Sequence, residues 1–186
     1  MRIAFVVYDG MTTLDFVGVF DPVTRLKSMG IRSDLSWQIC ARTLDVTDRE
    51  GLQLTPTQVS APLDKFDMVI VPGGLNSRTL AADAKFCQWI QTAENVSYKV
   101  SVCTGALLLA AAGLLRGRMA TTHPNAFDEL RAYGVTVVPD RIVDQGDVIT
   151  ARGVTASIDL GLYLCEKLAG VEARERIRLQ MDYKTD

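Results

Sequence analysis

The chain has 186 residues, 48% of them hydrophobic and 23% charged, with a formal net charge of −2, which predicts a single domain over residues 1–186 with a substantial core. Its basic residues are scattered rather than gathered into a patch, so the sequence predicts no nucleic-acid partner. The longest apolar run, Ala106 to Leu115, is too short to cross a membrane and no secretory leader pattern opens the sequence, so we expect a cytoplasmic protein without a membrane partner.

The four cysteines, Cys40, Cys87, Cys103 and Cys165, lie far apart, without a C-x-x-C pair. This spacing indicates neither a disulfide framework nor a zinc site, so no metal is expected. The sequence contains one histidine, His123. Any mechanism that needs a histidine therefore has a single candidate.

The chain opens with a predicted strand and helix. Ile3 to Tyr8 is a continuous apolar run that ends at a turn, which is typical of a strand buried on both faces in a parallel sheet. Thr12 is the expected N-cap of the following helix, with Asp15 three residues later at capping-box spacing. Pro22 is expected to kink or restart this helix.

The next segments alternate between strands and helices. Leu35 to Ala41 predicts a second strand, and Leu44 to Val59 predicts a β-hairpin excursion. Asp67 to Val71 predicts a short core strand that ends at Pro72-Gly73-Gly74, and Asp83 to Glu94 has the spacing of a helix on one sheet face.

The stretch around Cys103 has the pattern of a reactive site. A β-branched run ends at Cys103, and an Ala/Leu run typical of a buried helix begins after Gly105. A strand-to-helix corner of this kind is a nucleophile elbow. The amides and dipole of the helix favour a thiolate, so we expect the pKa of Cys103 to fall from ~8.5 toward roughly 3.5 to 7.5. The alternative is a small apolar residue in a tight turn.

The last third of the chain continues the alternation of strands and helices. The expected elements are a strand over Met119 to Thr122, a helix over Pro124 to Tyr133, strands over Val135 to Val138, Arg141 to Asp144 and Val148 to Thr150, the last two forming a hairpin, and helices over Gly153 to Leu168 and Val171 to Gln180. The order of these elements predicts a doubly wound α/β sandwich around a mostly parallel sheet.

Asp15 is the expected acidic partner of Cys103. The first strand and the strand before Cys103 are normally neighbours in this architecture, which would bring the two side chains together. Burial between Leu14 and Phe16 would raise the pKa of the Asp15 carboxyl and let it donate a hydrogen bond to the sulfur. The alternative is that Asp15 only caps its helix.

Other residues are expected around the same crevice. The amides of Gly73, Gly74 and Thr104 would form a pocket for negative charge on a bound substrate, unless the two glycines are only a structural turn. The Thr104 hydroxyl would bind substrate or water, or cap its helix. His123 is expected to line the pocket without transferring protons, and Arg152 to bind a carboxylate; a structural histidine and a solvated arginine are the alternatives.

Several motifs resemble the ThiJ/PfpI superfamily, and within it the isonitrile hydratases. The similar segments are Leu14 to Gly18, Phe66 to Gly74, Val102 to Ala106, Ala112 to His123 and Gly153 to Asp159. The resemblance implies a flavodoxin-like sandwich that forms a homodimer and uses no metal or organic cofactor. It also implies that Cys103 is the nucleophile, Asp15 its acidic partner and Thr104 a residue that holds the site. The implied reaction converts an isonitrile through a thioimidate to an N-substituted formamide.

Two positions depart from the hydratase pattern. Pro124 stands where the hydratases have tryptophan, and Arg152 where they have small residues. Both positions are similar instead to the parkinsonism-linked deglycase branch, which implies a glyoxalase or deglycase acting on 2-oxoaldehydes as an alternative. A third possibility is a ligand-sensing or redox-sensing module, because the domain also resembles the amino-terminal part of some AraC-type regulators.

Overall fold

The computed structural model describes residues 1–184 and is built around a seven-stranded sheet. Its strands are β1 (Arg2–Val6), β2 (Ser36–Ala41), β5 (Gln58–Val59), β6 (Met68–Val71), β7 (Tyr98–Val102), β10 (Ile142–Asp144) and β11 (Val148–Ala151). They lie in the order β10-β11-β7-β6-β1-β2-β5. All neighbouring pairs are parallel except β10 and β11, which form the predicted hairpin.

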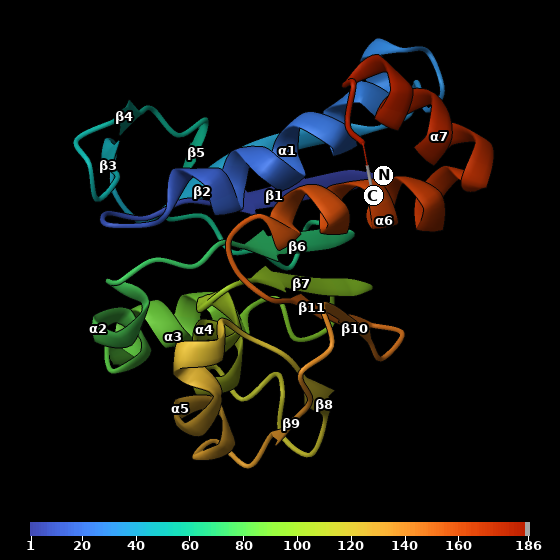
Figure 1. Cartoon of the computed structure of the whole chain (residues 1–186). Coiled ribbons are helices and arrows are strands. Elements are labelled where there is room, and N and C mark those ends of the chain that lie inside the picture. The colour runs from blue at the N-terminus through green and yellow to red at the C-terminus, as the bar shows by residue number, and fades with distance from the viewer. Residues whose placement is uncertain (185–186) are drawn as a thin grey trace.

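Helices cover both faces of this sheet, and Figure 1 shows them in two groups. One group contains α1 (Thr13–Ser28), α6 (Ala156–Ala169) and α7 (Val171–Gln180). The other contains α2 (Ser77–Ala81), α3 (Ala84–Gln91), α4 (Gly105–Ala111) and α5 (Phe127–Arg131), which follows a 3₁₀ turn over Pro124–Ala126. This arrangement confirms the predicted flavodoxin-like doubly wound fold. Within residues 1–184 no helix is long and apolar enough to span a membrane.

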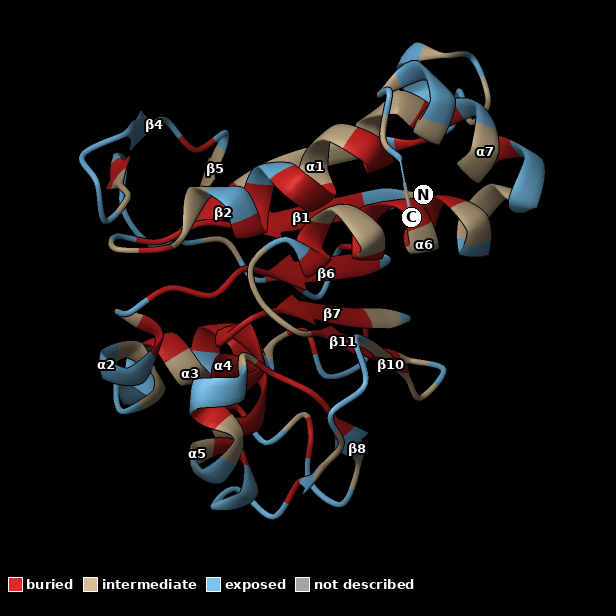
Figure 2. Ribbon diagram, viewed as in Figure 1, coloured by how far each residue is buried: buried red, intermediate tan, exposed pale blue. Residues whose placement is uncertain are grey.

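Two small sheets lie outside the central one. β3 (Val46–Thr47) and β4 (Gln53–Leu54) pair antiparallel, which confirms the predicted hairpin excursion. β8 (Met119–Ala120) and β9 (Thr136–Val137) pair parallel on the other side of the molecule. Figure 2 shows that β6 and β7 are buried along most of their length, whereas the β3–β4 hairpin is largely exposed. The core therefore lies around the central strands. The β3–β4 hairpin is not part of that core.

The prediction that β1 and β7 are neighbours is wrong, because β6 lies between them and pairs with both. The start of α1 nevertheless reaches the end of β7, since the loops after β1 and β6 are joined. The Thr12 amide donates to the Gly73 carbonyl over 2.8 Å, and Met11 forms a bridge with Gly74. These contacts place the start of α1, and with it Asp15, over the end of β6 and next to the end of β7.

Pro22 does not restart α1, which runs as one helix from Thr13 to Ser28; the expected kink stays a prediction. Proline removes the amide that would bond the carbonyl four residues earlier, here that of Gly18. Both Pro22 and that carbonyl pack against Gly161 of α6: a Cβ at position 161 would lie 2.8 Å from Pro22 Cγ and 2.9 Å from Gly18 O. Close packing of the two helices therefore accommodates the proline inside α1.

Candidate active site

Cys103 occupies a strained corner between β7 and α4. Its φ angle is +54°, in the left-handed region that residues other than glycine seldom adopt. Backbone contacts hold it there: the Cys103 amide donates to Ala151 O over 3.0 Å, and the Thr122 hydroxyl donates to Cys103 O over 2.7 Å. The nucleophile-elbow geometry that the sequence predicts is therefore present.

Glycine backbones enclose the sulfur on two sides. A Cβ at position 153 would lie 2.7 Å from Cys103 Sγ and 2.8 Å from His123 Cδ2. A Cβ at position 73 would lie 2.8 Å from Cys103 Cβ and 2.6 Å from the Thr104 nitrogen. All four distances are too short for a Cβ atom, so neither position accepts a side chain without a shift of its neighbours. No sequence pattern indicated the role of Gly153, because a glycine before a helix is common for local reasons.

A cavity of about 200 Å³ opens over Cys103. It is lined by Thr12, Arg49, Gly74, Leu75, Arg78, Cys103, Thr104, His123, Asn125 and Val154. Cys103 itself is only 5% exposed, but its accessible part faces this cavity rather than the hydrocarbon core. Among the described residues, no cluster of three or more His, Cys, Asp or Glu side chains has the arrangement of a metal site.

Asp15 lies fully buried beside Cys103. The Gly73 amide donates to its Oδ2 over 3.1 Å, so the carboxyl does not cap α1, which has no side-chain cap. Within residues 1–184, Oδ1 makes no hydrogen bond of ordinary geometry. Burial raises the pKa of Asp15 to about 7, and the Cys103 thiol and the Gly73 amide partly offset that rise.

The expected fall in the pKa of Cys103 is wrong. Burial, followed by the charge of Asp15, raises the pKa of Cys103 to about 12, although the Thr104 amide acts in the opposite direction. The helix dipole is therefore outweighed by desolvation and by a neighbouring carboxylate. Because both pKa values are raised, the Asp15–Cys103 pair holds one proton between about pH 7 and pH 12. The main arrangement is thiol with carboxylate, because the Asp15 carboxyl is the stronger acid, and the minor one is thiolate with carboxylic acid.

Tyr8, which the sequence analysis assigned only to a strand, also belongs to the surroundings of this pair. Its buried hydroxyl donates to Pro72 O over 2.9 Å, the carbonyl of the same peptide group whose N–H, on Gly73, donates to Asp15. Burial and the nearby charges of Asp15 and Cys103 raise the pKa of Tyr8 well above its ordinary value. Tyr8 therefore stays neutral and fixes the loop that holds the carboxyl.

The predicted pocket of three amides is not formed as expected. The Gly73 amide is bound to Asp15, and the Gly74 amide donates to Thr104 Oγ1 over 2.9 Å. The Thr104 hydroxyl in turn donates to Gly74 O over 3.0 Å, so it neither caps α4 nor points to a substrate. Thr104 instead fastens the β6 loop to the elbow, and its own amide faces the sulfur.

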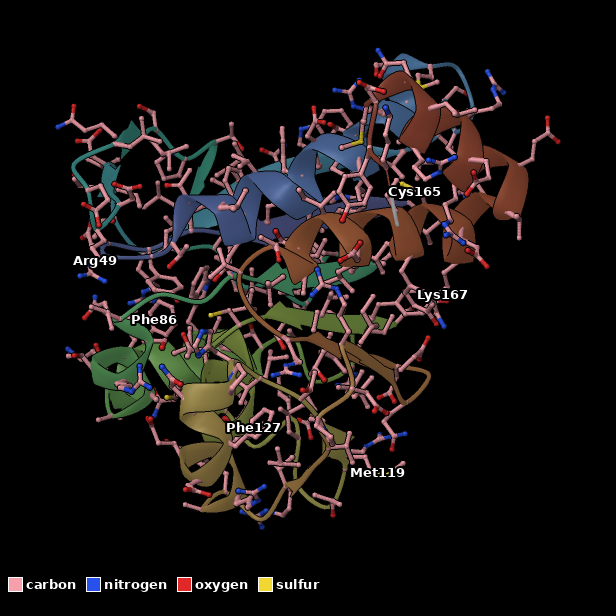
Figure 3. The ribbon with its side chains drawn as sticks, in the orientation of Figure 1. Arg49, Phe86, Met119, Phe127, Cys165 and Lys167 are labelled. Carbon is pink, nitrogen blue, oxygen red and sulfur yellow. The ribbon has the colours of Figure 1, made fainter. Side chains whose placement is uncertain are left out.

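His123 lies at the cavity, as expected, but Arg152 does not. The Asn125 amide donates to His123 Nδ1 over 3.2 Å, which leaves the proton of the neutral ring on Nε2. Arg152 bonds Pro139 O over 3.1 Å, and its guanidinium carbon lies 5.7 Å from the centre of the Phe127 ring, labelled in Figure 3. The prediction that Arg152 binds substrate in the crevice is therefore contradicted.

The cations at the cavity are two arginines that the sequence analysis did not single out. Arg49 extends from the tip of the β3–β4 hairpin, as Figure 3 shows, and Arg78 comes from α2. Arg78 is fixed by two hydrogen bonds to Glu129 of α5, of 2.8 and 2.6 Å. Neither arginine belongs to a recognisable motif, and only the folding of the loops brings them to Cys103.

Comparisons with known proteins show the family of the chain. The DJ-1/PfpI family model matches residues 1–167. An isonitrile hydratase from Pseudomonas putida is 36% identical over 184 residues, which cover 98% of this chain and 78% of the hydratase. The HTH-type transcriptional regulator CdhR from Pseudomonas aeruginosa is 28% identical over 95% of this chain but only 53% of the regulator. The crystal structure of a ThiJ/PfpI family protein from Pseudomonas syringae superposes with a TM-score of 0.89 at 33% identity, covering all of this chain and 76% of that one.

Proposed function

Because the chain belongs to the DJ-1/PfpI family, we propose that it is a cysteine-dependent hydratase that converts isonitriles to N-substituted formamides. The observation that carries this proposal is the buried Asp15–Cys103 pair, which holds one proton at a strained elbow facing a small cavity. The hydratase from Pseudomonas putida supports the choice of isonitriles as the substrate class.

In the first step, the thiolate form of Cys103 adds to the terminal carbon of the isonitrile. The Asp15 carboxylic acid gives its proton to the same carbon, so a carbon–sulfur and a carbon–hydrogen bond form together with no net change of charge. The product is a thioimidate on Cys103 and a carboxylate at Asp15. Sharing one proton between the two groups supplies nucleophile and acid at once.

In the second step, water adds to the thioimidate carbon. The Asp15 carboxylate accepts a proton from the water and passes it to the substrate nitrogen, giving a tetrahedral adduct. The carbon–sulfur bond then breaks, Cys103 leaves as a thiolate, and the hydroxyl proton returns to Asp15. The formamide is released, and the pair regains its single proton.

The neighbouring residues hold this geometry. The Thr104 amide stabilises the thiolate, and the Thr104 hydroxyl fixes Gly74 beside the cavity. His123 presents its Nε2 proton as a hydrogen-bond donor rather than as a base, since Nδ1 is already occupied by the Asn125 amide.

Incubating the protein with an alkyl isonitrile and measuring the N-alkylformamide tests the proposal. We expect formamide from the wild type and from Cys87→Ala, a matched control that removes a half-buried thiol away from the cavity. We expect none above background from Cys103→Ala. Formamide formation by Cys103→Ala at the wild-type rate would refute the mechanism.

A glyoxalase acting on 2-oxoaldehydes is the second candidate, and one observation favours it. His123 lies close to the sulfur, since one methyl group at position 153 would touch both, and its Nε2 proton suits an aldehyde oxygen better than an isonitrile carbon. Consumption of methylglyoxal without glutathione, lost in His123→Ala, would favour this reaction. No consumption would eliminate it.

We also propose that the protein acts as a homodimer. Leu14 and Val17 of α1 are 39% and 37% exposed although both are apolar, and they lie near the start of the helix that carries Asp15. Light scattering after size-exclusion chromatography should give twice the chain mass. A monomer at micromolar concentration would contradict the proposal.

A further inference from the structure

A second cavity, of about 320 Å³, lies between α2, α4 and α5. Its lining residues are Arg78, Ala81, Leu107, Glu129, Ala132 and Tyr133. Apart from the paired Arg78 and Glu129, these residues present methyl groups, an isobutyl group and the aromatic ring of Tyr133 with its hydroxyl. The proposed hydration steps use none of them, so the cavity is free for another role.

This second cavity begins close to the nucleophile. Arg78 lines both the second cavity and the cavity over Cys103. On α4, Leu107 follows Thr104 by one turn, and its amide donates to Thr104 O over 3.1 Å. Residues three apart lie on the same face of a helix, whose pitch is about 5.4 Å. The two cavities therefore share one lining residue, Arg78, and α4 contributes Leu107 to one of them, while Thr104, which precedes α4, lines the other.

The Arg78–Glu129 ion pair forms the boundary between the two cavities. The side chains are 38% and 41% exposed. Exposure to water limits the net stability that this ion pair contributes, although its bidentate geometry strengthens it, so displacing the guanidinium has a modest cost. The aliphatic stem of Arg78 remains as an apolar surface when its head group moves toward water. The Arg78 side chain can therefore move aside for an apolar group of the substrate. Neither Arg78 nor Glu129 is then left as a buried, unpaired charge, because both side chains reach water.

We infer that the second cavity binds the apolar N-substituent of the substrate, so that the protein prefers isonitriles with an extended alkyl group over methyl isonitrile. This inference rests on the proposed function for the reacting carbon. The interaction that selects the substrate is burial of methylene groups against Ala81, Leu107 and Ala132.

A binding series tests the cavity without requiring turnover. N-alkylformamides from methyl to hexyl are titrated by calorimetry into Cys103→Ala, and the same series into Cys103→Ala/Ala132→Trp. Ala132 is exposed at the end of α5, so tryptophan there fills the cavity without entering the core. Affinity should rise about fourfold for each methylene that is buried. The tryptophan variant should lose most of this rise.

Ala84→Trp in the same background is the matched control, because Ala84 is exposed at the start of α3 and does not line the second cavity. It should keep the full dependence on chain length. Equal affinity for all chain lengths, or the same loss in Ala84→Trp as in Ala132→Trp, would overturn the inference.

Turnover separates this inference from the proposed function. With both correct, the ratio of kcat/KM for hexyl over methyl isonitrile is above ten in the wild type and falls at least tenfold in Ala132→Trp. A length-dependent affinity for formamides without isonitrile turnover would refute the hydratase reaction and leave the apolar cavity established. Turnover of all isonitriles at one rate, with no effect of Ala132→Trp, would refute the cavity's role and leave the reaction standing.

Discussion

Cys103 and Cys165 are both buried, and burial raises the pKa of each thiol to about 12. Cys165, labelled in Figure 3, lies inside α6 and donates to Pro22 O over 3.3 Å. Cys103 lies at a positive φ angle, faces a cavity and has a buried carboxyl beside it. The two residues share burial and thiol pKa but differ in backbone strain, access and partner.

Under the proposed function, this difference means that a raised thiol pKa does not by itself make a cysteine inert. Desolvation is the resolved cause of the shift at Cys165, so nothing there favours the thiolate. At Cys103 part of the shift comes from the Asp15 charge, and that charge disappears whenever the carboxyl takes the proton. The proposed nucleophile is therefore distinguished from Cys165 by the Asp15 carboxyl beside it.

The largest expected effect comes from removing each sulfur in turn. Cys103→Ala should lower kcat/KM for an isonitrile by at least about a thousandfold, because the covalent step is lost. Cys165→Ala should keep activity within about twofold and lower the free energy of unfolding by roughly 1–2 kcal/mol through lost packing. Steady-state kinetics and urea unfolding measure both. Comparable losses of activity in the two variants would contradict the assignment of different roles to Cys103 and Cys165.

Asp15→Asn should lower kcat by roughly 10²–10³-fold with the fold intact, since asparagine can accept the Gly73 amide but cannot transfer protons. The wild-type rate should rise with pH through about 7, where the pair reaches its singly protonated state. The residual rate of Asp15→Asn should show no such inflection. A pH profile unchanged by the substitution would contradict the role of Asp15.

The same variant should be more stable than the wild type at pH 8. The folded pKa of Asp15, about 7, lies above its unfolded value of ~3.9, so the folded wild type loses stability as pH rises between these values. The full shift corresponds to as much as about 4 kcal/mol, and we expect a gain of ~2–4 kcal/mol at pH 8 that vanishes near pH 4. Denaturant unfolding at the two pH values measures it. A gain of equal size at pH 4 would show that the carboxylate charge is not its cause.

A smaller effect is expected from Gly153→Ala. The added methyl group would lie 2.7 Å from the sulfur and should displace it, lowering kcat/KM by about 10–100-fold. Gly30→Ala is the control: its φ is +71° with open space around it, so it should cost about 1 kcal/mol of stability and no activity. Full activity in Gly153→Ala would mean that the position of the sulfur is not critical.

Much of the fold was predictable from the sequence because its signals are local. Apolar runs ended by glycine or proline identified the strands, and the Cys103 corner follows from a β-branched run that meets an Ala/Leu run. The place of β6 between β1 and β7 is a property of the whole sheet, which no local pattern encodes. The continuity of α1 through Pro22 likewise depends on Gly161, far away in the sequence.

The candidate site was predictable in its nucleophile and acid but not in its electrostatics. Asp15 was expected near Cys103 through a pairing of β1 with β7 that the sheet does not have; the contacts of Thr12 with Gly73 and of Met11 with Gly74 bring it there instead. The thiol pKa depends on desolvation and on a charge whose distance the sequence does not give. Arg49 and Arg78 were missed because they reach the cavity from a hairpin tip and a short helix. Arg152 was wrongly placed there because Phe127 and Pro139 O hold its side chain elsewhere.

The most direct test is the rate at which iodoacetamide alkylates Cys103, followed by mass spectrometry from pH 5 to pH 10 in the wild type and in Asp15→Asn. The shared proton predicts a wild-type rate that rises around pH 7 and then levels off. In Asp15→Asn the rise near pH 7 should be absent. Identical profiles in the two proteins, rising only well above pH 8, would show that Cys103 titrates alone.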